Sequence, residues 1–238
     1  MEPTDKAARV AGAWYLSLVL IGFFSLMYVP GKLIVRGNAA ATAGNILAHE
    51  TLFRFGILAD LVGAVVFILL GLALYRLLVG VNKTHASLMV AFVLISAAIG
   101  FMNTLNDIAA LTLLRGGADF LSVFDKPRRE ALAMLFLRLG FQGNVINEIF
   151  WGLWLLPFGL LVMRSRFLPR ILGVWLIVDC CAYVALSIIG LLLPQYYDVA
   201  FRSAFPALLG EVAIMLWLLI KGARVQPSGA PALSSAGG

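Results

Sequence analysis

Long apolar runs constrain this chain more than any other feature, because about 18–20 consecutive apolar residues span a bilayer core as a helix. Val10–Val29 is an almost unbroken apolar run of about that length. Only 13% of the chain is charged and 62% is hydrophobic, whereas soluble domains carry about 25% charged residues. These properties predict an all-α, polytopic membrane protein.

Six such runs predict six transmembrane helices, at residues 9–29, 53–78, 86–114, 139–163, 170–193 and 204–221. We expect one transmembrane helical bundle domain over residues 1–222, followed by a low-complexity, disordered tail at 223–238. Asn38 is a plausible N-cap for a short interfacial helix before the second span. Asp125 and Pro127 predict the start of a helix that runs directly into the fourth span.

The distribution of Lys and Arg predicts that both termini are cytoplasmic. In this orientation the cytoplasmic segments hold Lys6, Arg9, Arg76, Lys83, Arg164, Arg166, Arg170, Lys221 and Arg224. The opposite side holds Lys32, Arg36, Arg115, Lys126, Arg128, Arg129 and Arg202. The tight loop that carries Arg164, Arg166 and Arg170 is the strongest inside signal.

The net charge of +6 does not indicate a nucleic-acid partner, because most basic residues lie at the ends of apolar runs. Cys180 and Cys181 are adjacent, so a disulfide between them is not expected. The sequence contains no H-E-x-x-H pattern, no P-loop and no G-x-G-x-x-G fingerprint. We therefore expect no metal, no cofactor and no nucleic acid, with the lipid bilayer as partner and the oligomeric state unassigned.

The pattern N-x-x-N-[DE] occurs twice inside apolar runs, at residues 103–107 and 144–148. Residues three and four apart share one face of a helix. The pattern thus predicts two polar patches, one of Asn103, Asn106 and Asp107 and the other of Asn144, Asn147 and Glu148. Because the third and fourth spans are antiparallel, we expect both patches at a similar depth in the membrane.

Other polar residues are expected at the same level. Asp60 and Glu211 lie about 10 Å inside their spans at a rise of 1.5 Å per residue, and Asp179 lies nearer the midplane. A charge at the bilayer centre costs at least about 2.5–3.5 kcal/mol, so these groups should face each other or water. The acids outnumber the nearby Arg54 and Arg138, so some must be protonated, hydrated or facing a cationic partner.

Three functions fit this pattern. The first is binding or transport of a small lipophilic or cationic molecule in a polar intramembrane cavity. The residues predicted to bind it are Asp60, Asn103, Asn106, Asn144, Asn147, Glu211, Arg54, Arg138 and Gln142. The second is a membrane-embedded isomerase or cyclase that acts on an isoprenoid or other lipid, with Asp107 and Glu148 as catalytic acid and base. The third is a structural or accessory subunit, in which the polar groups only join helices.

Several segments resemble one family of uncharacterised bacterial integral membrane proteins, the domain of unknown function numbered four-three-eight-six. They include "GKLIVRGNAAATAGNILAHETLFRFGILADLVG", "RSRFLPRILGVWL" and "GEVAIMLWLLIKG". The resemblance covers about residues 7–222. It implies a multi-pass protein of the bacterial inner membrane, and it implies no particular activity.

Overall fold

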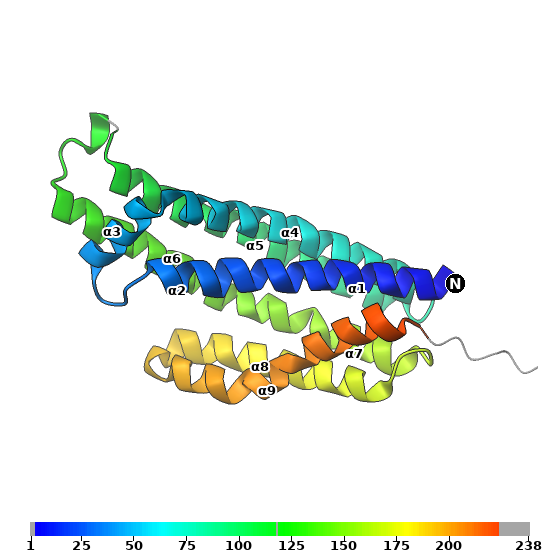
Figure 1. The fold of residues 1–238 in the computed structure, drawn as a ribbon. Coiled ribbons are helices and arrows are strands. Elements are labelled where there is room, and N and C mark those ends of the chain that lie inside the picture. The colour runs from blue at the N-terminus through cyan, green and yellow to red at the C-terminus, as the bar shows by residue number, and fades with distance from the viewer. Residues whose placement is uncertain (1–2, 118, 224–238) are drawn as a thin grey trace, which may run out of the picture.

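The computed structural model describes residues 3–117 and 119–223, and these ranges are helical and contain no strand (Figure 1). In chain order the elements are α1 (Pro3–Gly22), η1 (Phe23–Tyr28), α2 (Val29–Leu33), α3 (Ala39–Ala48), α4 (Glu50–Leu78), α5 (Lys83–Arg115), η2 (Asp119–Leu121), α6 (Lys126–Leu153), α7 (Leu155–Arg164), α8 (Arg170–Leu192), η3 (Pro194–Tyr196), α9 (Tyr197–Leu216) and η4 (Trp217–Lys221). Six helical segments are long and apolar enough to cross a membrane. The predicted multi-pass, all-α architecture is confirmed.

Five of the six helical segments extend beyond their predicted bounds, the second and third by only a few residues. The first continues through the π-helical turn η1 into α2 and ends at Leu33, the fourth begins at Lys126, and the sixth follows the short turn η3. Apolar runs mark only the part of a helix that meets lipid, whereas caps mark where the helix begins. The Asp125 side chain accepts a hydrogen bond from the Arg128 N–H at 3.0 Å, which confirms the predicted N-cap.

The short helix α3 also begins where the sequence predicts it. The Asn38 side chain accepts a hydrogen bond from the Ala41 N–H at 2.9 Å. This bond satisfies one of the N–H groups that an α-helix leaves unpaired at its start. As a result α3 packs across the end of the bundle against α6, with its Ile46 fully buried.

The fourth span consists of two helices, where the sequence predicts one. α6 ends at Leu153 and α7 begins at Leu155, with Trp154 between them. Pro157 explains the break, because it has no N–H to donate to the carbonyl of Leu153 four residues earlier. The Trp154 side chain is fully buried and stacks on Phe158 with ring centroids 5.4 Å apart.

The buried apolar residues form two separate clusters. The larger cluster joins α1, α4, α5, α7, α8 and α9 around Trp154. The smaller one lies at the α3 end of the bundle and includes Leu33, Ile46 and Phe53. This division leaves space between the clusters for the cavity described below.

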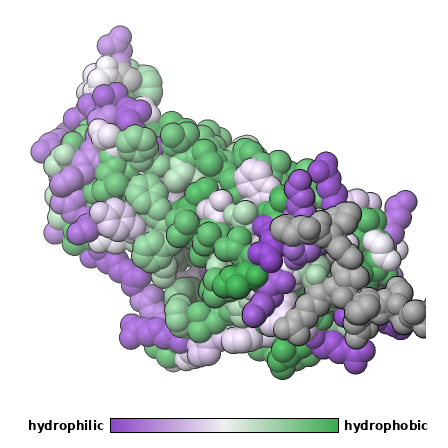
Figure 2. Space-filling view, turned by 45° about the vertical axis from the view of Figure 1, so that its right-hand side comes forward, coloured by the Kyte–Doolittle hydropathy of each residue, from purple (hydrophilic) through white to green (hydrophobic). Residues whose placement is uncertain are grey.

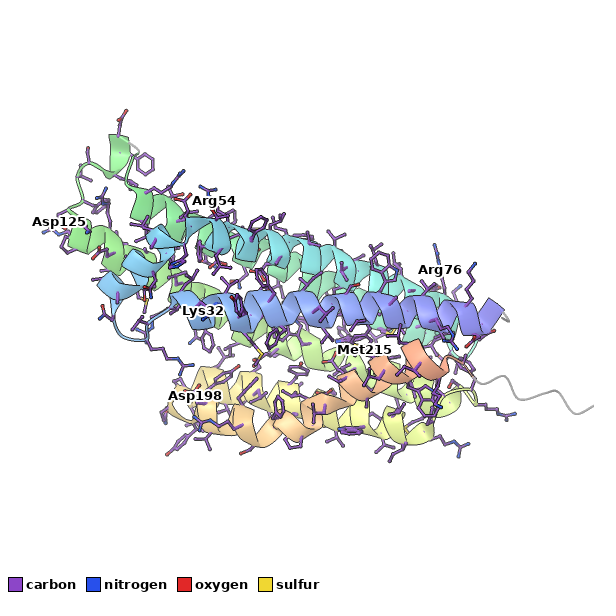
Figure 3. The ribbon with its side chains drawn as sticks, viewed as in Figure 1. Lys32, Arg54, Arg76, Asp125, Asp198 and Met215 are labelled. Carbon is purple, nitrogen blue, oxygen red and sulfur yellow. The ribbon has the colours of Figure 1, made fainter. Side chains whose placement is uncertain are left out.

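Both described ends of the chain lie at the same end of the bundle (Figure 1). Arg9 of α1 donates a hydrogen bond to the carbonyl of Leu219 in η4 at 3.3 Å. Arg76 lies at this end as well, whereas Asp125 lies at the opposite end (Figure 3). Of the predicted tail at 223–238, only Ala223 belongs to the described residues.

Candidate functional site

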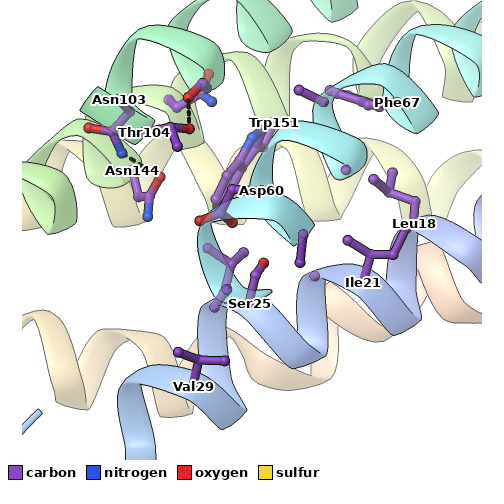
Figure 4. A pocket seen from close by; sticks show the side chains of 18 of the residues that line it. Leu18, Ile21, Ser25, Val29, Asp60, Phe67, Asn103, Thr104, Asn144 and Trp151 are labelled. Carbon is purple, nitrogen blue, oxygen red and sulfur yellow. Dashed lines mark hydrogen bonds between the residues drawn. The ribbon is translucent and has the colours of Figure 1, made fainter. Parts of the chain in front are cut away.

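A cavity of about 440 Å³ lies between α1, η1, α2, α4, α5, α6, α8 and α9, and we refer to it as the central cavity. Figure 4 shows it from close by. Its polar lining residues are Tyr15, Ser25, Asp60, Ser96, Asn103, Thr104, Asp107, Asn144, Asn147, Tyr183 and Glu211. Six of the residues predicted from sequence are therefore brought together: Asp60, Asn103, Asp107, Asn144, Asn147 and Glu211.

The two polar patches meet where α5 packs on α6. The Asn103 amide donates to Asn144 Oδ1 at 3.0 Å and to the carbonyl of Gly140 at 2.9 Å (Figure 4). Deeper in the bundle, Asn147 donates to the carbonyl of Ser96 at 3.2 Å. Gly143 permits this approach, since a Cβ at that position would overlap the side-chain amide of Asn103.

The acids of the two patches lie at different depths, which corrects the predicted common layer. Asn103 pairs with Asn144, and α5 and α6 are antiparallel. Asp107 and Glu148, each four residues after its paired asparagine, therefore lie toward opposite ends of the bundle. Asp107 accordingly lies beside Gly140, with 3.9 Å between Asp107 Oδ1 and the position of a Cβ on that glycine. Glu148 lies roughly 12 Å further along α6 at 1.5 Å per residue.

Glu148 lies outside the residues that line the central cavity. Its side chain is buried, and its Oε1 accepts a hydrogen bond from the hydroxyl of Tyr197 in α9. Among the described residues, its second oxygen Oε2 has no hydrogen-bond partner. The candidate acid–base pair, Asp107 and Glu148, is therefore not assembled around one space.

Asp107 instead lies close to a carboxyl on another helix. Asp60 of α4 and Asp107 of α5 both line the central cavity, and their charges interact. The Ser25 hydroxyl of η1 lies beside the Asp60 carboxyl (Figure 4). Three elements thus contribute oxygen atoms to this part of the cavity.

Glu211 of α9 provides a third carboxyl, near the aromatic end of the cavity. Its Oε2 accepts a hydrogen bond from the Tyr15 hydroxyl of α1 at 2.5 Å. Tyr183 of α8 also interacts with Glu211, and its ring packs edge-on against Trp151 with 6.1 Å between the ring centroids. The lining residues Tyr15, Tyr183 and Ser25 were not predicted from the sequence.

The remaining predicted binding residues lie outside the cavity lining. Arg54 is exposed and pairs with Glu50 on its own helix, with 2.6 Å between Nε and Oε1. Arg138 is exposed, and Gln142 is partly buried. Asn106 donates to Asn103 Oδ1 at 3.1 Å and borders a shallow surface depression.

The charge of the lining is therefore one-sided. The described lining residues include the carboxyls of Asp60, Asp107 and Glu211 and include no Lys, Arg or His. Within residues 3–117 and 119–223, no group of three or more His, Cys, Asp and Glu could hold a metal ion. The cavity is thus lined mainly by apolar residues, with three acidic side chains and no basic one among the described residues.

Part of the rim is apolar and faces the outside of the bundle. Leu26 of η1 is 42% exposed and Phe141 of α6 is 48% exposed, and both line the cavity. Figure 2 shows a hollow among hydrophobic residues on the face of the molecule that it presents. In a membrane such a surface contacts acyl chains.

One ion pair bridges two elements that border the cavity. Arg36, in the connection between α2 and α3, approaches Asp198 at the start of α9, with 2.6 Å between Nη1 and Oδ2. The hydrogen bond to the Asp198 carboxylate raises the pKa of Arg36 above its ordinary value. The side chains are 80% and 50% exposed, and such exposed pairs contribute only about 0–1 kcal/mol. The pair therefore holds α2 and α9 together only weakly.

Comparison with known proteins identifies a family. Residues 10–222 match the model of the family described as "Domain of unknown function (DUF4386)". This match confirms the resemblance found in the sequence. Comparisons with curated proteins and with solved structures find no match.

Proposed function

The chain belongs to the DUF4386 family of domains of unknown function, and we propose that it is a multi-pass protein of the bacterial inner membrane that binds or transports a small lipophilic cation in the central cavity. The all-helical architecture supports this location, because proteins that span outer membranes of bacteria are mostly barrels. From the sequence we expected a ligand that is either lipophilic or cationic. The proposal is narrower, because it requires one ligand to be both.

The one-sided charge of the lining carries the proposal. Asp60, Asp107 and Glu211 face a space that no described basic side chain lines. Carboxyl groups inside a membrane bundle are costly unless they pair with something. A cationic ligand would supply the missing positive charge.

The aromatic lining supports a lipophilic cation over a small hydrated ion. Trp151, Trp154 and Tyr183 line the cavity, and Tyr183 also interacts with Glu211. Aromatic faces attract cations, by about 2 kcal/mol or more when the pair is shielded from water. The volume of about 440 Å³ falls in the range of about 300–1,000 Å³ that small-molecule sites occupy.

The rim supports access from the bilayer. Exposed Leu26 and Phe141 border the cavity on a lipid-facing surface. An amphiphilic molecule dissolved in the membrane could reach the carboxyls through this side without crossing water. This route suits a ligand that is both apolar and charged.

Thermal unfolding of the full-length protein in detergent tests the proposal, with tetraphenylphosphonium as probe. Tetraphenylborate, of similar size and opposite charge, is the matched control. A ligand that binds only the folded state raises stability as its concentration exceeds Kd. We expect stabilisation by the cation alone. Equal stabilisation by both ions, or by neither, would contradict the proposal.

Substitutions at the cavity carboxyls add a second test. Asp60→Asn and Asp107→Asn keep the shape of the side chain and remove its charge, so we expect affinity for the cation to fall about tenfold, a loss of about 1.4 kcal/mol. Asp119→Asn, in exposed η2, is the control and should leave affinity unchanged. If the cavity variants change only stability, the structural-subunit function is favoured instead.

The acid–base enzyme predicted as an alternative receives less support. General acid–base catalysis requires each group within hydrogen-bonding reach of the reacting atoms. Asp107 lies beside Gly140 of α6, and Glu148 lies roughly 12 Å from Gly140 along α6. Glu148 also does not line the cavity. Asp60 and Asp107, which both line the cavity, are the carboxyls that could act on one substrate.

A further inference from the structure

A second carboxyl lies directly behind Glu211, outside the cavity lining. Asp179 of α8 is fully buried, and neither of its carboxyl oxygens has a side-chain hydrogen-bond partner among the described residues. The charges of Asp179 and Glu211 interact. Gly210, the residue before Glu211 in α9, faces Asp179: a Cβ at that position would lie 3.4 Å from Asp179 Oδ2. We refer to Asp179 and Glu211 as the inner pair.

The groups that surround the inner pair are neutral or acidic. Tyr15 of α1 donates to Glu211, and Tyr183 of α8 interacts with both members of the pair. The Cys180 thiol lies next to Asp179 on α8, and Glu148 of α6 is within electrostatic reach of Tyr183. None of these described neighbours carries a positive charge.

Two adjacent carboxylates in this setting cannot both be ionised at low cost. Like charges repel strongly where the effective dielectric constant is low. Asp179 is buried and no described side chain donates to it, so its ionised form would be poorly solvated. One proton shared by the pair removes this repulsion. A cation in the cavity beside Glu211 would remove it as well.

We infer that the inner pair holds one proton while the cavity is empty and releases it when a lipophilic cation binds beside Glu211. This inference rests on the proposed function and adds its regulation: binding is an exchange of one proton for one cation. On binding, one carboxyl O–H bond breaks and the proton passes to bulk water, so the net charge of the site is unchanged. The exchange links occupancy of the cavity to pH.

Proton release in weakly buffered detergent solution, followed with a pH indicator dye, tests the exchange with tetraphenylphosphonium as the probe. We expect about one proton per cation bound, and hence affinity that rises about tenfold per pH unit where the pair is protonated. In Asp179→Asn the repulsion is absent, so binding should persist without proton release. Asp119→Asn is the control and should behave as the native protein.

Two results would overturn the inference: binding by the native protein without proton release, or equal release by Asp179→Asn. Infrared spectroscopy of the ligand-free protein provides a test that does not depend on binding. The carbonyl band of protonated carboxyls at neutral pH should weaken in Asp179→Asn and, separately, in Glu211→Gln. If the probe fails to bind, the proposed function and the exchange fail, while this spectrum still decides whether the inner pair holds a proton. A carbonyl band that is unchanged in both variants would refute the shared proton. If Asp179→Asn does not fold, Glu211→Gln alone provides the test.

Discussion

At the residue scale, glycine sets how closely the helices approach. Gly159 of α7 and Gly173 of α8 face each other, and a Cβ on either one would lie 2.6–2.7 Å from the backbone oxygen of the other. Such contacts replace the hydrophobic drive that helices lack inside lipid, because close approach maximises van der Waals contact. A methyl group here meets backbone, which cannot rotate away.

We therefore expect Gly173→Ala to lower the free energy of unfolding by about 1–3 kcal/mol, the usual cost of overpacking. Gly44→Ala is the matched control, since Gly44 lies within α3 and a Cβ there would meet nothing within 4 Å. The control should be neutral or stabilising by up to about 1 kcal/mol, because alanine favours helix. Denaturant titration in detergent compares the two, and equal effects would refute the close contact.

At the element scale, the antiparallel pairing of α5 and α6 determines which polar groups meet. The two copies of the N-x-x-N-[DE] motif run in opposite directions in these helices. Their amides Asn103 and Asn144 therefore meet, whereas their acids Asp107 and Glu148 lie apart. Asp107 thereby joins Asp60 of α4, whereas Glu148 joins Tyr197 of α9. One sequence pattern thus contributes to two different environments.

A double-mutant cycle of Asn103→Ala and Asn144→Ala measures the amide contact between these helices. We expect a coupling energy of about 0.6 kcal/mol, and at most about 1.7 kcal/mol, as found for interhelical hydrogen bonds in membranes. Asn103 keeps its bond to the Gly140 carbonyl when Asn144 is replaced, which limits the effect. Strictly additive effects of the two substitutions would show that the amides do not interact.

At the scale of the whole molecule, the cavity exists because the core is divided. One cluster packs around Trp154 and the other around Leu33 and Phe53, while the central cavity lies between them. The two described ends of the chain meet at one end of the bundle through Arg9 and Leu219. Because both ends lie on the same side, the number of spans is even. The side that faces the cytoplasm stays a prediction.

Labelling of single cysteines tests the orientation, in a chain whose Cys180 and Cys181 are replaced by alanine. With cytoplasmic termini, Ser122→Cys should react with an impermeant maleimide in intact spheroplasts. Thr84→Cys, at the opposite end of the bundle, should react only after permeabilisation. Both positions are exposed, so a reversed pattern would mean that the termini lie outside.

Much of the fold follows from local sequence. Run length predicts the six spans, since a helix must satisfy its own backbone hydrogen bonds in lipid, and caps such as Asn38 and Asp125 predict two helix starts. The break at Trp154 was missed, although Pro157 three residues later was a signal for it. The cavity was predicted in part, through Asp60, Asn103 and Asn144, because polar side chains in apolar runs must face inward.

The sequence by itself determined that this chain crosses a membrane six times and directs its amides and acids away from lipid. Only the tertiary structure decided which of those groups share a space. Which polar groups line the cavity depends on the register between helices. That register is set by contacts between residues far apart in the chain, such as Asn103 with Gly140. Tyr15 and Ser25 line the cavity for the same reason: their own helix carries no pattern that marks them, and their neighbours come from other helices.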